Sequence, residues 1–154
     1  MDVVISHINA DFDCLASLAA AGRLYPGALL CFPGSQEKNL HSFCLRHPDL
    51  LPPLVRPKEI DFPSITRLII VDCQQSGRIG RFSELLADES IPVHIYDHHP
   101  PAADSINSSG GIVRQAGSTA TIMTTLLKER GIVPSQSEAQ LLLLGIPEDT
   151  GRLL

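Results

Sequence analysis

The run Arg67-Leu68-Ile69-Ile70-Val71-Asp72 places four consecutive aliphatic residues directly before a carboxylate. An uninterrupted apolar run of this length is typical of a strand in a parallel sheet that is covered on both faces. We therefore expect a buried parallel strand here, with Asp72 just beyond its carboxyl end.

Shorter apolar runs elsewhere alternate with segments that have the spacing of amphipathic helices. Strands are predicted at 3–5, 28–32, 93–96 and 112–113, and helices at 13–25, 37–46, 83–87, 118–130 and 135–146. This alternation predicts an α/β fold, namely a doubly wound parallel β-sheet of about five strands with helices on both faces. The proline-rich segment 48–64 predicts an irregular connection, with a short strand near 54–55.

The size and composition of the chain are those of one globular domain. Its 154 residues are 44% hydrophobic and 19% charged, which excludes disorder as the general state. A net charge of −5 argues against a broad basic face for duplex nucleic acid. The four cysteines show no C-x-x-C spacing, and there is neither a signal segment nor a membrane span, so we expect a cytoplasmic protein with reduced thiols.

Acidic and histidine side chains recur just beyond the predicted strands or in turns. His7, Asp72 and the triplet Asp97-His98-His99 each follow an apolar run. In open parallel sheets, ligands bind beyond the carboxyl ends of the strands, so these three strand ends should converge. Asp11 and Asp13, in a turn or first helical turn, and Asp149, after the last predicted helix, offer further carboxylates.

The resulting set of candidate ligands mixes imidazole and carboxylate, which suits Mn, Fe or Zn better than Ca, with Mg also compatible at an oxygen-rich position. The candidates are His7, Asp11, Asp13, Asp72, His98 and Asp149. Six ligands exceed one closed zinc site and fit two ions that share a carboxylate, an arrangement that implies phosphoester hydrolysis. Asp72, on the central strand, is our choice for the shared ligand.

Five motifs in these positions resemble, in order, those of the DHH phosphoesterase superfamily, which includes RecJ-type exonucleases, oligoribonucleases, cyclic-dinucleotide phosphodiesterases and family II inorganic pyrophosphatases. The motifs are His7 to Asp13, Val71 to Cys73, Asp97 to His99, Gly117 to Ala120 and Glu148 to Gly151. The chain most resembles the N-terminal module of bacterial proteins that join DHH, CBS and poly(A)-polymerase-like (tRNA nucleotidyltransferase-like) domains. Residues 1–154 are therefore expected to be a single DHH domain from the N-terminal part of a longer multidomain protein.

The resemblance also implies a role for each motif residue. One metal would be held by His7, Asp11 and Asp72, and the other by Asp13, Asp72, His98 and Asp149. Asp72, His98 and His99 would form the catalytic group, with His99 facing the substrate phosphate. Asp97 would orient an imidazole as an acceptor instead of binding metal.

Further candidates concern the substrate phosphate. The helix that opens at Gly117-Ser118-Thr119 offers free N–H groups and a positive dipole end, which predicts a phosphate seat. Arg78 and Arg114 could add charge to a phosphate, although each fits a solvated surface cation equally well. The four cysteines and the run Leu141 to Leu144 are interpreted as core residues, and His41, His47 and His94 as surface or satisfied core imidazoles.

The expected function is divalent-metal-dependent hydrolysis of a phosphodiester or phosphate ester in a short RNA or nucleotide. Two ions, Mn²⁺ first and Mg²⁺ as the alternative, would activate the attacking water. One alternative is a regulatory or RNA-binding DHH module with little activity alone, which would meet tRNA through further C-terminal domains. Inorganic pyrophosphatase is a weaker alternative, because no cluster of Lys and Arg for so ionic a substrate is evident. Apolar surface near residue 154 would favour a homodimer.

Overall fold

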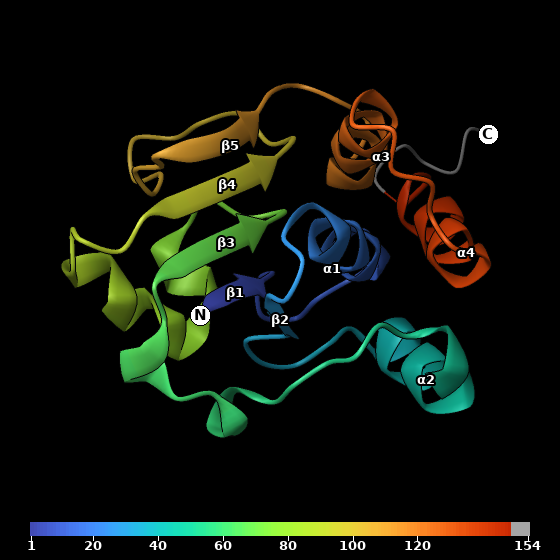
Figure 1. Cartoon of the computed structure of the whole chain (residues 1–154), viewed down its shortest axis with the longest axis horizontal. Coiled ribbons are helices and arrows are strands. Elements are labelled where there is room, and N and C mark those ends of the chain that lie inside the picture. Colours follow the sequence, from blue (N-terminus) through green and yellow to red (C-terminus); the bar gives the residue numbers. More distant parts are fainter. Residues whose placement is uncertain (149–154) are drawn as a thin grey trace.

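The computed structural model describes residues 1–148, which fold around one five-stranded parallel sheet with strand order β2-β1-β3-β4-β5 (Figure 1). The strands are β1 (Asp2–Ile5), β2 (Leu29–Cys31), β3 (Arg67–Val71), β4 (Val93–Asp97) and β5 (Gly110–Val113). Every pair of neighbours is parallel. The predicted doubly wound sheet of about five strands is confirmed, and the strand order reverses direction between β1 and β3, where such sheets bind their ligands.

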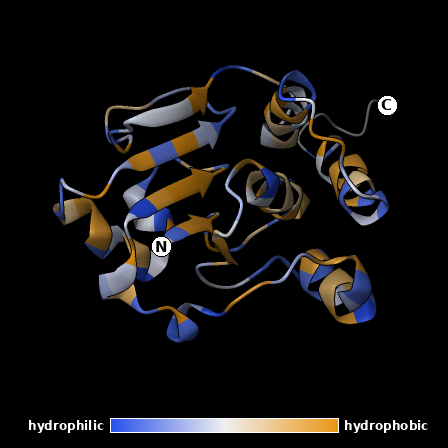
Figure 2. Ribbon diagram, viewed as in Figure 1, coloured by the Kyte–Doolittle hydropathy of each residue, from blue (hydrophilic) through white to orange (hydrophobic). Residues whose placement is uncertain are grey.

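The four α-helices of residues 1–148 lie to one side of the sheet or beyond its carboxyl ends (Figure 1). They are α1 (Phe12–Leu24), α2 (Lys38–Arg46), α3 (Thr119–Glu129) and α4 (Gln136–Gly145). Val4, Ile69 and Tyr96 point from the strands into one apolar cluster with residues of α1, α3 and α4. Figure 2 shows β3 as a mostly hydrophobic ribbon, whereas β4 carries hydrophilic stretches and β5 is mostly pale. The apolar pattern of a sheet buried on both faces is therefore clearest at the centre of the sheet.

The opposite face of the sheet is covered by short 3₁₀ helices, not α-helices. Leu68, Ile70 and Ile95 form a second apolar cluster there with residues such as Ile60 and Phe82. The 3₁₀ segments of this face are Pro57–Glu59, Phe62–Ser64, Ser76–Arg78 and Gly80–Ala87, whereas a further one, Pro48–Leu50, lies against α4. The helix predicted over 83–87 therefore exists in a longer 3₁₀ form. The short strand expected near 54–55 is a single parallel bridge between Leu30 and Leu54.

The starts of the α-helices follow their sequence signals. Asp11 caps α1 by accepting from the N–H of Cys14, and Ser118 caps α3 by accepting from the N–H of Thr121. A capping box begins α4, since Ser135 and Glu138 exchange side-chain to backbone hydrogen bonds. These caps fix where α1, α3 and α4 begin relative to the sheet, whereas α2 has no side-chain cap.

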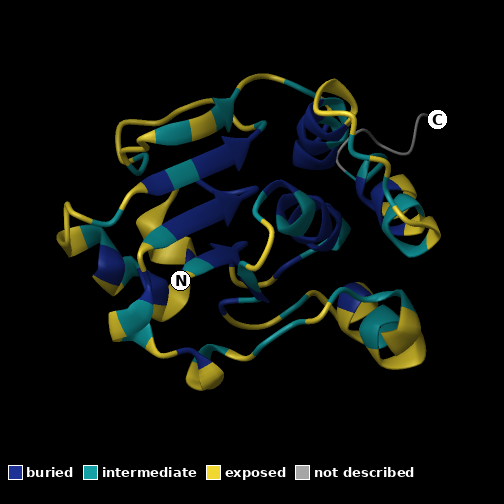
Figure 3. Ribbon diagram, in the orientation of Figure 1, coloured by how far each residue is buried: buried dark blue, intermediate teal, exposed yellow. Residues whose placement is uncertain are grey.

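The strands β1, β3 and β4 are mostly buried, whereas β5 is mostly half-buried and α2 is largely exposed (Figure 3). Gly111, in β5, has φ of +93°, and a Cβ there would lie 2.0 Å from the carbonyl oxygen of Ile95. Only glycine therefore allows β5 to pair with β4 at this point.

The run Leu141 to Leu144 was expected to be core along its whole length, which is wrong for half of it. Leu141 and Leu142 are buried, whereas Leu143 is 72% and Leu144 38% exposed, because successive residues of α4 point to different sides of the helix. Among the helices of residues 1–148, none has both the length and the apolar character needed to cross a membrane.

Candidate metal centre

Histidine and aspartate side chains that follow three neighbouring strands lie close together at the carboxyl edge of the sheet. His7 follows β1, Asp72 follows β3 and His98 follows β4. Because β1 pairs with β3 and β3 with β4 in parallel register, the three strand ends lie side by side. The convergence predicted from the sequence is therefore present.

Asp72 lies at the centre of this group. Its Oδ2 is 3.5 Å from Nε2 of His7, and its Oδ1 is 3.5 Å from Nε2 of His98. The hydroxyl of Thr119 donates to Oδ1 at 2.9 Å. Asp72 has φ of +61°, a left-handed conformation that costs a non-glycine residue of the order of 1 kcal/mol and is concentrated at functional sites. The carboxylate is thus held with one oxygen toward each imidazole.

Each of these imidazoles turns its Nε2 toward Asp72 because its other nitrogen contacts a backbone carbonyl. Nδ1 of His7 lies 2.7 Å from the oxygen of Ile8, and Nδ1 of His98 lies 3.2 Å from that of Ala116. With the proton on Nδ1, both Nε2 lone pairs face the carboxylate, which is the arrangement typical of metal-binding histidines. In this tautomer, the 3.1 Å approach of the Arg78 guanidinium to Nδ1 of His7 is a contact without a hydrogen bond.

Asp11 and Cys14 extend the group on the side of His7. The Oδ1 of Asp11 accepts from the N–H of Cys14 at 3.0 Å. Ligand atoms of His7, Asp11, Cys14 and Asp72 all lie within 4.8 Å of one another. Sequence reasoning missed Cys14, which was assigned to the core. Its position three residues after Asp11, in the first turn of a helix, is the signal that could have placed it there.

Asp13 is completely buried between the starts of α1 and α3. Its Oδ2 accepts from the N–H of Thr119 at 3.0 Å, and its Oδ1 from the N–H of Ala120 at 2.7 Å. Oδ2 also lies 3.7 Å from Nε2 of His98, so Asp13 faces the same space as His98.

These contacts correct the expected phosphate seat at Gly117-Ser118-Thr119. The N–H groups of Thr119 and Ala120 hold the carboxylate of Asp13, and the Ser118 hydroxyl caps α3. Ser118 and Thr119 are themselves buried. The positive end of α3 thus orients a protein carboxylate where we expected a substrate phosphate.

Asp97 and Gln74 form a support behind His99. One oxygen of the buried Asp97 is 2.7 Å from Nδ1 of His99, and the other accepts from the Gln74 amide at 2.7 Å. The same amide donates to the carbonyl of His99 at 3.0 Å. Asp97 thus lies where an acceptor that orients an imidazole should lie. Gln74 was missed, because a lone glutamine after a strand carries no distinctive sequence signal.

A pocket of about 240 Å³ opens beside this support, and Asp72, Arg78 and His99 contribute to its lining. The His99 side chain is 47% exposed, in contrast to 10% for His98. His99 and Arg78 therefore lie where a substrate could reach them. Arg114, just after β5, is exposed and is not part of the lining.

Burial and neighbouring charges shift the pKa values of the side chains around His7. Burial alone would lower the pKa of His7, but its hydrogen bond to Asp72 and its backbone contact raise that pKa above the usual value. Burial, followed by the charge of Asp72, raises the pKa of Asp11 and raises that of Cys14 well above its usual range.

The remaining predicted residues lie elsewhere. Asp149 falls outside the described residues. His41 and His47 are exposed, and His94 is half-buried at the other end of β4. Cys31 and Cys73 are buried and Cys44 is partly buried, and the sulfur of Cys73 contacts the backbone of Gln75.

Comparison with known proteins identifies the family. Residues 3–146 match the family model described as "DHH family, N-terminal domain". The chain belongs to the DHH family. It is 50% identical over 153 residues to an A-adding tRNA nucleotidyltransferase of Geobacter sulfurreducens and 31% identical over 150 residues to one of Aquifex aeolicus. These matches cover 99% and 97% of this chain but only 17% of each relative.

Solved structures share the fold of this DHH domain at low sequence identity. An exopolyphosphatase-related protein from Bacteroides fragilis superposes with a TM-score of 0.75 at 19% identity, covering 99% of this chain and 46% of that one. A putative family II inorganic pyrophosphatase of Methanococcus jannaschii gives 0.73 at 20% identity, covering 99% and 49%. Exonuclease RecJ bound to manganese gives 0.52 at 18% identity, covering 96% and 38%. The expected resemblance to the DHH superfamily is confirmed.

The donor set of the DHH domain can hold divalent metal. Imidazole nitrogens of His7 and His98 and carboxylates of Asp11, Asp13 and Asp72 meet at one strand edge, and such mixed N/O donors suit Mn, Fe or Zn. A second group of possible ligands joins Asp72 and His98 to Asp97 and His99. Asp97 already forms hydrogen bonds with Gln74 and His99. It is therefore better suited to orienting His99 than to binding a metal ion.

Proposed function

We propose that this DHH domain binds two divalent cations, Mn²⁺ first and Mg²⁺ as the alternative, and hydrolyses a phosphodiester or phosphate ester of a short RNA or nucleotide. The observation that carries the proposal is the position of Asp72, whose two oxygens each lie 3.5 Å from a different imidazole. A carboxylate so placed can bridge two ions. His7 and Asp11 would complete one site, and Asp13, His98 and Asp149 the other.

A pair of ions in this place would lower the pKa of a water molecule and neutralise charge on a phosphoryl group. The residues of the chain supply the remaining requirements. Thr119, Ile8 and Ala116 hold Asp72, His7 and His98 in orientation. Asp97 fixes Nδ1 of His99, so the other ring nitrogen is left for a substrate oxygen. Arg78 adds positive charge to the pocket that His99 lines.

The nucleotide or short RNA in this proposal is supported by the names of the relatives, which are tRNA nucleotidyltransferases. The chain spans about a sixth of their length and matches the N-terminal DHH domain. We propose that residues 1–154 are one DHH domain within a protein whose other domains contact tRNA. Because those relatives carry a different activity in their name, a regulatory or RNA-binding role with little turnover is the second candidate.

Pyrophosphatase is the weakest candidate. Of the described residues that line the pocket, Arg78 alone carries a positive charge, whereas pyrophosphate would need several cations. The likeness to the pyrophosphatase structure is a likeness of fold, and a fold by itself does not establish an activity.

One assay separates the candidates. Mn-loaded protein and its Asp72→Ala variant are incubated with a short oligoribonucleotide, a cyclic dinucleotide, a nucleoside bisphosphate and pyrophosphate. We expect Mn-dependent release of nucleotide or phosphate from at least one of the first three substrates. The Asp72→Ala variant should lose this activity. Equal background rates for both proteins on every substrate would reject hydrolysis and leave the regulatory role.

A further inference from the structure

The thiol of Cys14 lies inside the centre assigned to His7. Cys14 is completely buried, and its sulfur is 3.1 Å from Nε2 of His7 and 3.5 Å from Oδ2 of Asp72. Its backbone N–H donates to Asp11. The sulfur therefore touches or adjoins all three residues proposed to hold this ion, and the four ligand atoms lie within 4.8 Å of one another.

The measured separations allow a single ion to reach the sulfur as well as the nitrogen and oxygen. With bonds of ~2.1 Å to nitrogen and ~2.3 Å to sulfur, the N···S separation of 3.1 Å corresponds to an angle of about 90° at the ion. With a bond of ~2.1 Å to oxygen, the S···O separation of 3.5 Å corresponds to an angle of about 105°. Both angles are ordinary for ions with four to six ligands.

We propose that Cys14 is a thiolate ligand of the ion held by His7, Asp11 and Asp72. This inference rests on the two-metal centre of the proposed function. It implies that the two metal positions differ in the metal that they prefer. Soft thiolate with imidazole favours Zn, Co or Fe(II), whereas the carboxylates and His98 on the other side of Asp72 suit Mn or Mg. On binding, the S–H bond breaks, the proton passes to solvent and a sulfur–metal bond forms, with no change of oxidation state.

The competing interpretation is that Cys14 only fills space. It does adjoin an apolar cluster that includes Ala10, Leu15 and Leu40. A thiol with a purely packing role would leave the bound ion with nitrogen and oxygen donors alone. The number of sulfur atoms around the ion therefore decides between the two interpretations.

Cobalt provides the first test. The intact protein is titrated with Co²⁺, and the near-ultraviolet absorption of sulfur-to-cobalt charge transfer is followed. We expect this band in the native protein, its loss in Cys14→Ser and its retention in Cys31→Ser, a matched control because Cys31 is equally buried and lies outside the ligand group. Binding of cobalt without the band, or a band that persists in Cys14→Ser, would overturn the inference.

Zinc provides a test that does not depend on a variant that folds. X-ray absorption of the native protein loaded with Zn²⁺ should show one sulfur at ~2.3 Å, and a shell of nitrogen and oxygen alone would overturn the inference. Where Cys14→Ser folds, its Zn²⁺ affinity should fall by at least the ~10–100-fold that loss of an outer partner costs, with a smaller change for Mn²⁺. Equal losses for both metals would contradict the assignment.

These experiments distinguish failure of the Cys14 assignment from failure of the two-metal centre. Bound metal without a sulfur ligand would remove only the role of Cys14 and leave the two-metal phosphoesterase intact. Failure of Mn²⁺, Co²⁺ and Zn²⁺ to bind at all would overturn the metal centre and, with it, both proposals.

Discussion

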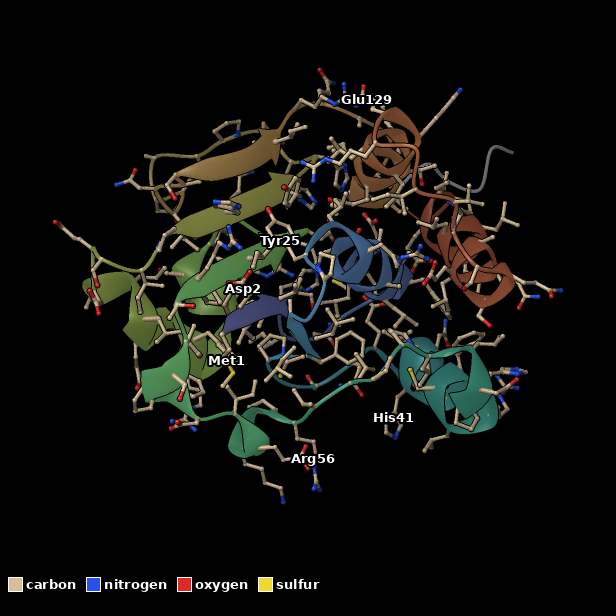
Figure 4. The ribbon with its side chains drawn as sticks, viewed as in Figure 1. Met1, Asp2, Tyr25, His41, Arg56 and Glu129 are labelled. Carbon is tan, nitrogen blue, oxygen red and sulfur yellow. The ribbon has the colours of Figure 1, made fainter. Side chains whose placement is uncertain are left out.

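At the amino ends of the strands, polar side chains pair with one another. Asp2 forms an ion pair with Arg67 at 2.5 Å, and the hydroxyl of Tyr25 lies 2.7 Å from both Nδ1 of His94 and the hydroxyl of Tyr96. Asp2 and Tyr25 are labelled in Figure 4. At the carboxyl ends, Asp72 meets two imidazoles at the longer distance of 3.5 Å, among further carboxylates. At the amino ends, these polar side chains therefore have partners among themselves. At the carboxyl ends, there are more carboxylates than positively charged side chains to balance them.

The pKa values of the imidazoles at the two ends shift in opposite directions. Burial and then the charge of Arg67 lower the pKa of His94, which favours its neutral form. The pKa of His7 is raised in spite of its burial, because Asp72 favours its charged form. The contrast teaches that ligand candidates are separated from structural polar residues by what surrounds them and not by residue type.

The largest effect is expected when the two histidines of β4 are compared. His98→Ala should lower the metal-dependent rate by about 10³-fold, because loss of one group that stabilises transition-state charge costs 10²–10³-fold and a metal site is also damaged. His94→Ala should keep both the rate and the metal content. Activity assays with metal analysis check this, and equal losses for the two variants would remove the distinction between the ends.

His99→Ala should lower the rate by about 10²-fold, the lower range for loss of a group that handles a proton, with the metal content unchanged. The reason is that His99 lines the pocket and is held by Asp97. His41→Ala, which changes an exposed imidazole far from the site, is the control. Loss of metal from His99→Ala would instead make His99 a ligand.

Metal binding should strengthen as the pH rises. The raised pKa of His7 means that the metal-free fold binds its proton more tightly than the unfolded chain does. This group therefore stabilises the metal-free fold below its unfolded pKa, and the contribution is lost as the pH rises through the folded value. Because metal must displace that proton, its affinity should rise by up to about tenfold per pH unit in this window.

The measurement for this prediction is the Mn²⁺-induced shift in the midpoint of thermal unfolding at about pH 6 and about pH 8. We expect the larger shift at the higher pH. A shift that is the same at both, or larger at the lower pH, would show that His7 does not give up a proton to metal.

The smallest effect concerns the amino end. Tyr25→Phe removes a hydroxyl that bonds with His94 and Tyr96, and it should lower the free energy of unfolding by about 1 kcal/mol without altering metal binding. Chemical denaturation and metal titration check the two parts. Unchanged stability would contradict the view that this cluster is structural, and weakened metal binding would link the two ends.

The strands and the converging ligands could be predicted because their signals are local. The apolar run before Asp72 and the triplet after β4 mark buried strands and their polar ends directly in the sequence. The convergence of His7, Asp72 and His98 then follows from parallel pairing alone.

The contacts that orient the ligands could not be predicted, since they join residues far apart in the chain. The start of α3 holds Asp13 across 106 residues, so its N–H groups looked free for phosphate when only the local pattern was considered. The left-handed backbone of Asp72 and the position of Cys14 beside His7 likewise depend on tertiary packing. The 3₁₀ form of Gly80–Ala87 could not be predicted either, because the spacing of its apolar residues Phe82, Leu85 and Leu86 is equally compatible with an α-helix.

The most direct test of the central claim is anomalous diffraction from crystals of the protein grown with Mn²⁺. We expect two manganese peaks ~3.5–4 Å apart, one between His7 and Asp72 and the other between Asp72 and His98. A single ion that does not touch Asp72, or no peak at this edge of the sheet, would contradict it.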